Sequence, residues 1–418
     1  MYLRGSKFDL TRRRKRANPL RIFILVVLVG IALYFNQVVV PQTPPLFVPT
    51  PTATRSPESY IADAQALASQ GKIPQAINAY QEALRVDPKN ISAYVTLARL
   101  QIYTARYAEA ITNAENALLL NPNNAQALAL RGWAKAFLGD YLEAESSLKQ
   151  AIQLDPSNPA PYAYYAEMLM LQQLEGKGDL NTLDKAIEYS KKAQELGPNT
   201  LEAHRARGIV LENTNNIEEA VSEYEAAISI NPYIADLHLA LGRSYRSLPE
   251  PDYAKAIEQF NYAIPLDPTN PLPKTYLSRT YFLAGEYAKS IQYGEEAIKN
   301  APDDPYLHGN LGIVLRRNFE LERAVTELRL AVRGGKTSDG VVVKGLPIDY
   351  GIVAQYYYNY GLALANVGEC TEAIQIAQAL QINLPRDDIA QYNAQEMLNI
   401  CASQLGGVTP TPGGTPTP

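Results

Sequence analysis

The chain has 418 residues, of which 46% are apolar and 19% are charged, so it is long enough to bury a large core. Its formal net charge is −5, but residues 1–21 carry eight basic residues and one acid, which leaves the rest of the chain acidic. This distribution argues against a nucleic-acid binder, because such a protein needs its positive charge on the folded part.

An uncharged apolar segment follows the basic residues. It begins with "IFILVVLVGIALYF" at Ile22, and Val38–Val40 extend it to about 19 residues, or roughly 28 Å of helix. That length matches the hydrocarbon thickness of a bilayer, so we predict a transmembrane helix over residues 22–40. A cleaved signal peptide and a buried core helix are the alternatives. The bulky sequence "NQVVVPQ" lacks the small residues that signal cleavage requires.

The flanks of this segment predict its orientation and its surroundings. Segments rich in Lys and Arg stay in the cytoplasm, so "TRRRKR" predicts that residues 1–21 are cytoplasmic and that the chain after the helix is extracytoplasmic. The protein is therefore expected to be single-pass in the cytoplasmic membrane. Residues 41–56 are rich in Pro and Thr, which predicts a semi-rigid linker. The similar composition of residues 406–418 predicts a disordered tail.

A proline motif recurs through the rest of the chain. The stretches "ALRVDPKN", "ALLLNPNN" and "AIQLDPSN" place Pro88, Pro122 and Pro156 at a spacing of 34 residues. Fixed self-similarity at this period indicates a repeat array. With each proline at position 32 of its repeat, small residues recur at positions 8, 20 and 27. Position 20 holds Ala76, Ala110, Ala144, Ala186, Ala220, Ala256, Ser290, Ala324 and Ala373. Small side chains at fixed places indicate helices that pack closely.

This pattern resembles the tetratricopeptide repeat family, which has small residues at positions 8, 20 and 27, an aromatic residue at 24 and proline at 32. The resemblance covers residues 57–405 in about nine copies, and it implies an all-α solenoid of helix-turn-helix units. A single unit cannot bury its apolar face alone, so stacking on its neighbours stabilises it. The stretch from Asp387 to Leu405 predicts one more helix that caps the array.

Two long insertions interrupt the repeats, near residues 172–183 and 334–353, and a short one lies near "LPEPD". The insertion at 334–353 contains Val341–Val343, then Lys344-Gly345, then Leu346-Pro347-Ile348, which favours a short β-hairpin or an extended flap. Insertions in solenoids often cluster on a binding face. A surface loop without a function is the alternative.

Motifs that carry chemistry are not evident. "GKTSDG" at Gly335 contains Gly-Lys-Thr but lacks the glycine that a phosphate loop requires five residues before the lysine. The histidines all fall at position 4 of different copies, where most other copies have tyrosine, so we expect them to fill a packing position: His204, His238 and His308. The repeats leave no room for a catalytic domain. We therefore expect a chain that is not an enzyme and has no catalytic residues, metal or cofactor.

The two cysteines lie at the end of the array. Cys370 starts the second helix of the ninth copy, and Cys401 ends the predicted capping helix. These places lie on the same edge of a helical stack, so a disulfide that pins the cap is one expectation for a protein outside the cytoplasm. Two buried free thiols are the alternative.

The resemblance implies that the first helices of the repeats line a concave groove, with positions 2, 5, 9, 12 and 13 pointing into it. Copies two to four place an apolar patch with the sole tryptophan there, and later copies place arginines. The candidate groove residues are Arg99, Trp133, Phe137, Met170, Leu171, Arg205, Arg243, Arg246, Arg279, Phe282, Arg316 and Arg317.

Arginine binds carboxylates through two parallel hydrogen bonds, so we expect the groove to take an acidic peptide segment. The alternative is that these arginines pair with acids of neighbouring helices, such as Glu202, Glu212 and Asp236. The family's carboxylate clamp uses Lys and Asn at positions 5 and 9. This sequence has Arg205 and Ile209 at those positions in the fifth copy, so that clamp is not expected.

The predicted function is a membrane-anchored scaffold for protein–protein assembly at the outer side of the cytoplasmic membrane in a bacterial-type cell envelope. Its partner is a protein or peptide that the sequence does not identify, and no small-molecule substrate is expected. One alternative is a non-catalytic subunit of an envelope enzyme complex, such as a glycosyltransferase or the wall or polysaccharide machinery. A cytoplasmic chaperone-type adaptor is another.

Overall fold

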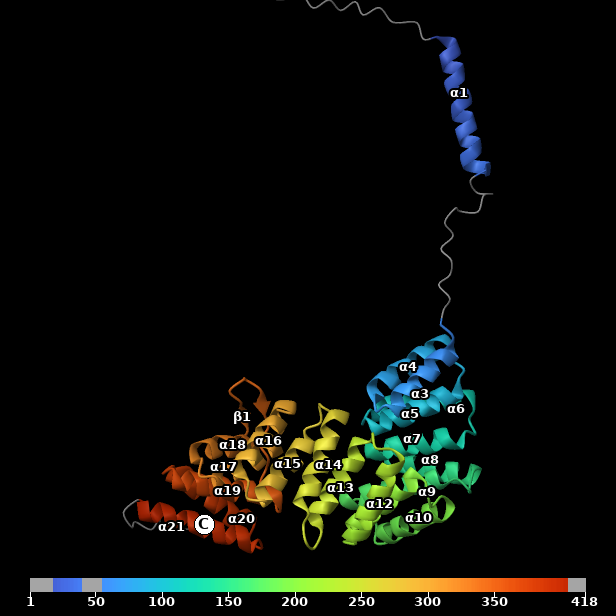
Figure 1. The fold of residues 1–418 in the computed structure, drawn as a ribbon. Coiled ribbons are helices and arrows are strands. Elements are labelled where there is room, and N and C mark those ends of the chain that lie inside the picture. Colours follow the sequence, from blue (N-terminus) through green and yellow to red (C-terminus); the bar gives the residue numbers. More distant parts are fainter. Residues whose placement is uncertain (1–17, 40–54, 405–418) are drawn as a thin grey trace, which may run out of the picture. The chain divides into compact units, whose positions relative to one another are not determined.

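The computed structural model describes residues 18–39 and 55–404, which fall into two units divided at Arg55 (Figure 1). The predicted basic segment before residue 18, most of the linker and the tail lie outside the described residues. Both described units are largely helical.

The first unit contains one helix, α1 (Pro19–Tyr34), which continues into a short π-helix, η1 (Phe35–Val39). The side chain of Asn18 accepts a hydrogen bond from the Leu20 N–H at 3.1 Å and so caps the start of α1. The span Pro19–Val38 has a mean hydropathy of 2.1 and none of it is buried. By length and composition it is a candidate membrane span or signal sequence.

The second unit is a stack of nine helix pairs followed by a single helix, as the resemblance predicted. The first helices of the pairs are α3 (Pro57–Ser69), α5 (Ile91–Tyr103), α7 (Ala125–Phe137), α9 (Pro159–Leu174), α11 (Leu201–Asn213), α13 (Ala235–Ser247), α15 (Leu272–Leu283), α17 (Pro305–Arg317) and α19 (Ile352–Asn366). The second helices are α4 (Ile73–Val86), α6 (Tyr107–Leu120), α8 (Tyr141–Leu154), α10 (Thr182–Leu196), α12 (Ile217–Ile230), α14 (Tyr253–Leu266), α16 (Tyr287–Asn300), α18 (Leu321–Arg333) and α20 (Cys370–Asn383). The last helix is α21 (Asp388–Gln404).

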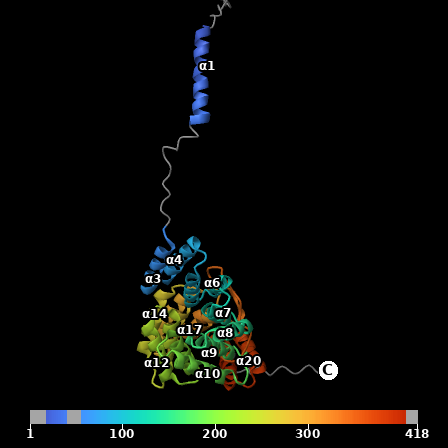
Figure 2. The same cartoon turned by 90° about the vertical axis from the view of Figure 1, so that its right-hand side faces the viewer.

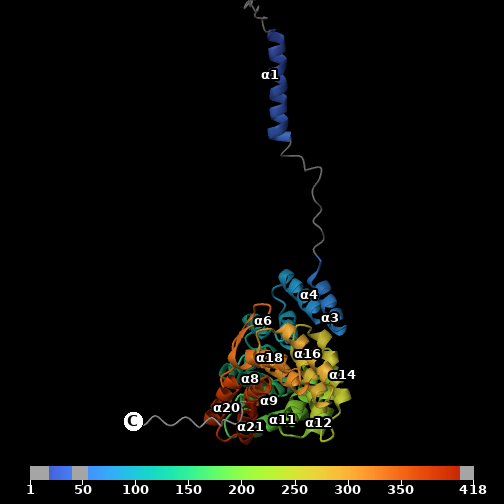
Figure 3. The same ribbon diagram turned by 90° about the vertical axis from the view of Figure 1, so that its left-hand side faces the viewer.

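Each helix of the stack packs on its own partner and on the next pair, so the predicted all-α solenoid is confirmed. Figure 2 views the stack from the side of α7 to α10, and Figure 3 views it from the side of α18 to α21.

The recurring Asp/Asn-Pro motif ends one helix and also starts the next. Asn90, Asn124 and Asn158 each cap a first helix, because their side-chain oxygens accept backbone N–H groups at 3.0, 2.9 and 3.0 Å. Earlier in the motif, Asp87 accepts the Lys89 N–H at 3.1 Å and closes the turn. These capping asparagines recur with the same spacing of 34 residues as the prolines, so the repeat pattern also contains a signal for the start of these helices.

Close packing explains the small residues at position 8. A Cβ atom on Gly208 would lie 2.7 Å from the ring of Tyr224, and one on Gly242 would lie 2.5 Å from the ring of Phe260. Both rings come from position 24 of the same repeat and are fully buried. The aromatic side chain therefore occupies the space that a larger residue at position 8 would need.

The long insertion between α18 and α19 forms a hairpin of β1 (Gly335–Lys336) and β2 (Val342–Val343), which pair antiparallel. Its turn lies between Thr337 and Val341, where the Thr337 N–H donates to the Val341 carbonyl at 2.9 Å. Of the two alternatives for this insertion, the structure therefore shows the short β-hairpin. The hairpin is fixed to the stack because Val343 is buried.

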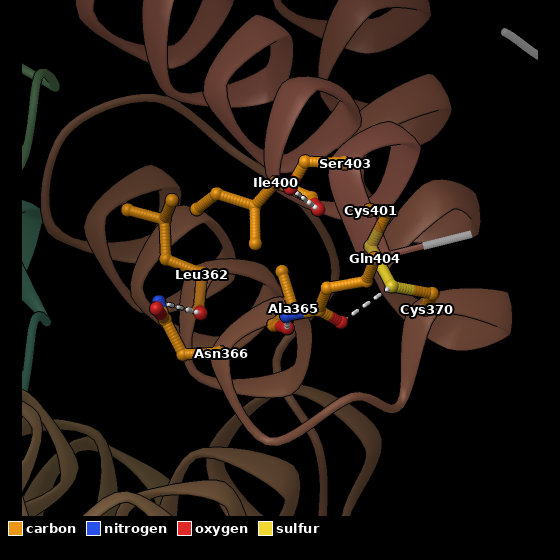
Figure 4. The surroundings of a disulfide bond; sticks show 8 residues. All are labelled: Leu362, Ala365, Asn366, Cys370, Ile400, Cys401, Ser403 and Gln404. Atoms are coloured by element: carbon orange, nitrogen blue, oxygen red, sulfur yellow. Dashed lines mark hydrogen bonds between the residues drawn. A yellow bond between two sulfur atoms is a disulfide. The ribbon is translucent and has the colours of Figure 1, made fainter. Parts of the chain in front are cut away.

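A disulfide joins Cys370, at the start of α20, to Cys401, near the end of α21 (Figure 4). The two Cα atoms lie 5.4 Å apart, and 31 residues separate the cysteines in the chain. Beside it, the side chain of Gln404 donates a hydrogen bond to the Ala365 carbonyl at 3.0 Å. Both contacts hold the last helix against the ninth pair, so they close the exposed end of the solenoid.

We predict that Cys401→Ser destabilises this end of the protein. Closing a loop of this length removes chain entropy from the unfolded state and is expected to contribute about 3–4 kcal/mol. Thermal unfolding followed by circular dichroism should show an earlier loss of helix in the variant. The wild type should show the same early loss only when a reductant is present. Reaction of both thiols with an alkylating reagent in denatured, unreduced protein would contradict the disulfide.

Candidate binding surface on the inner helices

The first helices of the pairs face a common space inside the curve of the stack, which we call the inner surface. Two cavities of about 170 and 180 Å³ lie on it, and the second joins Tyr103 of α5 to Leu239 of α13 and Leu272 of α15. Residues that lie far apart in the sequence therefore share one enclosed region.

The sole tryptophan lies inside this region rather than on a surface patch. Trp133 is fully buried, its ring stacks on Tyr164 with centroids 4.1 Å apart, and its Nε1 donates to Glu167 at 2.9 Å. Met170 is also buried, with 2% exposure. Both side chains are buried among the inner helices, yet Met170 lines the first cavity and Trp133 lines the second, so their contact with a partner stays a prediction. Phe137 is half-buried and lines both cavities.

Arg205 of α11 is the centre of a buried ion network. Its Nε donates to Glu167 of α9 at 3.0 and 3.2 Å, and its Nη2 donates to Asp236 of α13 at 2.5 Å. Arg205 is only 4% exposed, and its guanidinium also lies over the Trp133 ring at 5.3 Å. Arg205 lines both cavities, but its pairing agrees with the alternative that these arginines bind acids of neighbouring helices, and it joins three successive pairs of the stack.

The environment acts differently on the two acids. Burial raises the pKa of Glu167 above its usual range, although Arg205 opposes this effect. Burial also acts on Asp236, but the charges of Arg205 and Arg243 hold its pKa below its usual range. Half of the Asp236 side chain is exposed, whereas Glu167 is enclosed. Loss of Arg205 would therefore leave mainly the Glu167 carboxylate both buried and unpaired, which is the larger loss of free energy. Glu167 occupies position 9 of its repeat, and that groove position could have indicated it from the sequence.

A second ion pair continues along the inner surface. Arg243 of α13 donates to both carboxylate oxygens of Glu212 of α11, at 3.0 and 3.0 Å. Tyr224 donates its hydroxyl to the same carboxylate at 2.8 Å. The alternative expectation of internal pairing therefore holds for Arg243 as well as for Arg205.

The first pair approaches the sixth across the inside of the curve. A Cβ on Gly71, in the turn between α3 and α4, would lie 2.4 Å from the ring of Tyr233, which directly precedes α13. Arg99 of α5 is half-buried, and its Nε has no hydrogen-bond partner among the described residues. Burial opposes its charge, but Tyr164, Tyr103 and Glu202 raise the pKa of Arg99 overall. Arg99 therefore belongs to the enclosed region.

The later inner helices are different. Arg279 of α15 and Arg317 of α17 are exposed, and Arg246 of α13, Phe282 of α15 and Arg316 of α17 are half-buried. Within the described residues, none of these four arginines forms a salt bridge, and Arg316 donates its Nε to the Asn359 side chain at 2.6 Å. These five are the predicted groove residues of the later helices that stay available to a partner, whereas Leu171 of α9 is half-buried and lines the first cavity. We call these five residues the open inner surface.

The histidines take part in packing between successive pairs. His238 and His308 each place Nε2 near the carbonyl of the seam proline, Pro232 or Pro302, at 2.9 and 3.0 Å. His204 and His308 also contact a glutamate of their own second helix at 2.6 Å. The described residues contain no group of three His, Cys, Asp or Glu side chains that could hold a metal ion. The Gly-Lys of "GKTSDG" forms β1 directly after helix α18, whereas a phosphate loop follows a strand.

Comparison with known proteins agrees with this geometry. A family model described as TPR repeat matches residues 64–101, and one described as tetratricopeptide repeat matches residues 95–159 and 205–271. The chain contains tetratricopeptide repeats. This fold serves as a scaffold for protein–protein interaction, and it is generally not catalytic, so the expected partners are proteins.

The similar proteins are distant from this tetratricopeptide repeat chain. The human tetratricopeptide repeat protein 13 is 28% identical over 142 residues, which is 34% of this chain and 16% of that protein. The crystal structure of the APC/C hetero-tetramer Cut9-Hcn1 aligns with a TM-score of 0.54 and 14% identity, covering 91% of this chain and 82% of that one. A tetratricopeptide repeat protein from Parabacteroides merdae has a TM-score of 0.38 and 15% identity, covering 62% and 98%. At these identities the solved structures show the fold alone.

We predict that Arg205→Met destabilises the protein by about 3–5 kcal/mol, because it leaves the buried Glu167 carboxylate without its partner. Arg329→Met is the control, since Arg329 is exposed and its pairs with Glu369 and Glu372 should contribute about 1 kcal/mol or less. Chemical denaturation of the three proteins measures both losses. A loss for Arg205→Met no larger than that of the control would contradict the buried network.

We also predict that His308 makes stability depend on pH. Burial lowers the pKa of His308, but hydrogen bonds to Glu327 and to the Pro302 carbonyl raise it overall above the usual 6.5. The stabilisation from protonated His308 is therefore complete below the pKa that this side chain has in the unfolded protein. It is lost as the pH rises through the higher pKa that His308 has in the folded protein. Between about pH 6 and pH 8, the melting temperature of the wild type should fall relative to that of His308→Gln. Parallel melting temperatures across this range would contradict the role of His308.

Proposed function

We propose that this protein is a membrane-anchored scaffold that binds segments of partner proteins on the open inner surface. The tetratricopeptide repeats support a role in protein–protein interaction. The proposed location of the site rests on one observation. Four arginines on neighbouring inner helices form no salt bridge with the described residues: Arg246, Arg279, Arg316 and Arg317. By contrast, internal acids already pair with Arg205 of α11 and Arg243 of α13. The arginines without salt bridges are therefore the ones that we expect to bind a partner.

We propose the same chain organisation that the sequence suggested: a cytoplasmic segment at 1–21, a membrane helix at 22–40, a linker at 41–56, the repeats at 57–405 and a tail at 406–418. The apolar span of α1 and its basic flank support this topology. The disulfide also favours an oxidising compartment outside the cytoplasm. In this arrangement the scaffold acts at the outer side of the cytoplasmic membrane of a bacterial-type envelope.

We infer that the chain contributes binding and not catalysis. Tetratricopeptide repeats are generally non-catalytic, and the described helices from α3 onward all belong to the repeats or their cap. An enzymatic activity of an assembly that contains this protein would then come from a partner subunit.

The topology predicts that protease added to intact, wall-free cells digests the repeats. A tag placed before Arg12 should stay protected, whereas one placed after residue 405 should be lost, and immunoblotting of the two tags measures both. Protection of the carboxyl-terminal tag would contradict an extracytoplasmic location.

The binding surface predicts where a partner touches the protein. A photo-crosslinking amino acid at Phe282, on the open inner surface, should give a discrete crosslinked protein in native membranes. The same group at Leu119 should not, although Leu119 is 82% exposed, because it lies on a second helix. Mass spectrometry of the adducts identifies the partner. Equal crosslinking at both positions would contradict a site on the inner surface.

A further inference from the structure

Two successive seams of the stack can be compared position by position on the inner surface. Between α11 and α13, position 12 of one repeat holds Glu212 and position 9 of the next holds Arg243. These two side chains form the bidentate pair described above. Between α13 and α15, the same two positions hold Arg246 and Arg279. The arginine of the second repeat is kept, but its carboxylate partner is replaced by another arginine.

The surroundings of Arg246 contain no substitute for that carboxylate. Its Nη1 is buried and has no hydrogen-bond partner among the described residues. Burial and the nearby charge of Arg279 lower the pKa of Arg246 to about 10. Such a cluster disfavours its own positive charge and becomes more stable when an anion enters.

The side chains of this seam are also held in position. The guanidinium groups of Arg246 and Arg243 lie over the ring of Tyr276 of α15, at 5.5 and 5.9 Å from its centroid. A guanidinium that stacks on an aromatic ring keeps its edge free for hydrogen bonds. Asp304 is a carboxylate near this cluster, since both Asp304 and Arg279 affect the pKa of Tyr356. Its side chain caps α17 by accepting the Tyr306 N–H at 2.8 Å. It forms no salt bridge with Arg279 in the described part of the chain.

We propose that Arg246 and Arg279 form a binding site for a carboxylate side chain supplied by a partner protein, in the place that Glu212 occupies one seam earlier. This inference deepens the proposed function and rests on it. The neighbouring seam argues for a carboxylate over a phosphate, because there the same position pair already binds a carboxylate through two parallel hydrogen bonds. The open inner surface continues to Phe282, so the bound segment carries an apolar residue close to its acid.

The test uses the purified protein and a fluorescently labelled peptide of alternating glutamate and serine. Fluorescence anisotropy should show binding of this peptide but not of its glutamine counterpart. Arg246→Glu should weaken binding at least about tenfold, because the new glutamate side chain would itself form an ion pair with Arg279 and exclude the peptide's carboxylate. The same variant should unfold at an equal or higher temperature than the wild type, since it recreates the Glu212–Arg243 pair.

Two further variants keep the test decisive. Arg279→Met removes an exposed side chain without disturbing the core and should weaken binding to the same extent. Arg85→Glu is the matched control, because Arg85 is exposed on α4, and this variant should bind like the wild type. Equal affinity for the glutamate and glutamine peptides, or unchanged binding by both groove variants, would overturn the proposal.

Binding experiments with other anionic ligands test whether the site prefers phosphate. Binding of a phosphoserine peptide, or of phosphatidylglycerol vesicles, without binding of the glutamate peptide would assign the site to phosphate and overturn the carboxylate proposal. Crosslinking from Phe282 to a protein would still support the proposed function in that case. Absence of a crosslinked protein together with glutamate binding would contradict the proposed function but not the chemistry of this site.

Discussion

A charge enclosed in a protein has to be paired, and in this solenoid that constraint decides which part of the inner surface is closed. Arg205 is buried and bonds to Glu167 and Asp236, so it connects α9, α11 and α13 through one guanidinium. Trp133 donates its Nε1 hydrogen to the Glu167 carboxylate and stacks on the ring of Tyr164. Because removal of any one of these groups leaves another unsatisfied, the first six pairs are expected to behave as a rigid part of the scaffold.

Beyond that region the same repeat positions serve a different purpose. Between α11 and α13, Glu212 pairs with Arg243. Between α13 and α15, Arg246 occupies the position that corresponds to Glu212. A repeat protein can therefore change an internal contact into an external one by a single residue, without altering the packing of its helices. In this protein the closed repeats support the open ones.

The sequence predicted the fold well because the small residues at positions 8, 20 and 27 act locally, within a pair and between neighbours. The hairpin near Val342 was predicted only as one of two alternatives, because strands this short depend on packing against α18 and not on a local sequence pattern. The inner surface was harder to predict. Repeat positions indicate which side chains point inward, but not how tightly the stack curves, so they did not predict the burial of Trp133 and Met170 or decide whether Arg205 pairs internally. Glu167 was overlooked for the same reason.

The inner surface is closed around Arg205 and open around Arg279. Modification of the folded protein with phenylglyoxal, followed by peptide mass spectrometry, measures the reactivity of each arginine directly. We expect early modification of Arg279 and Arg317 and protection of Arg205 until the protein unfolds. Modification of Arg205 as fast as Arg279 in the folded protein would contradict this expectation.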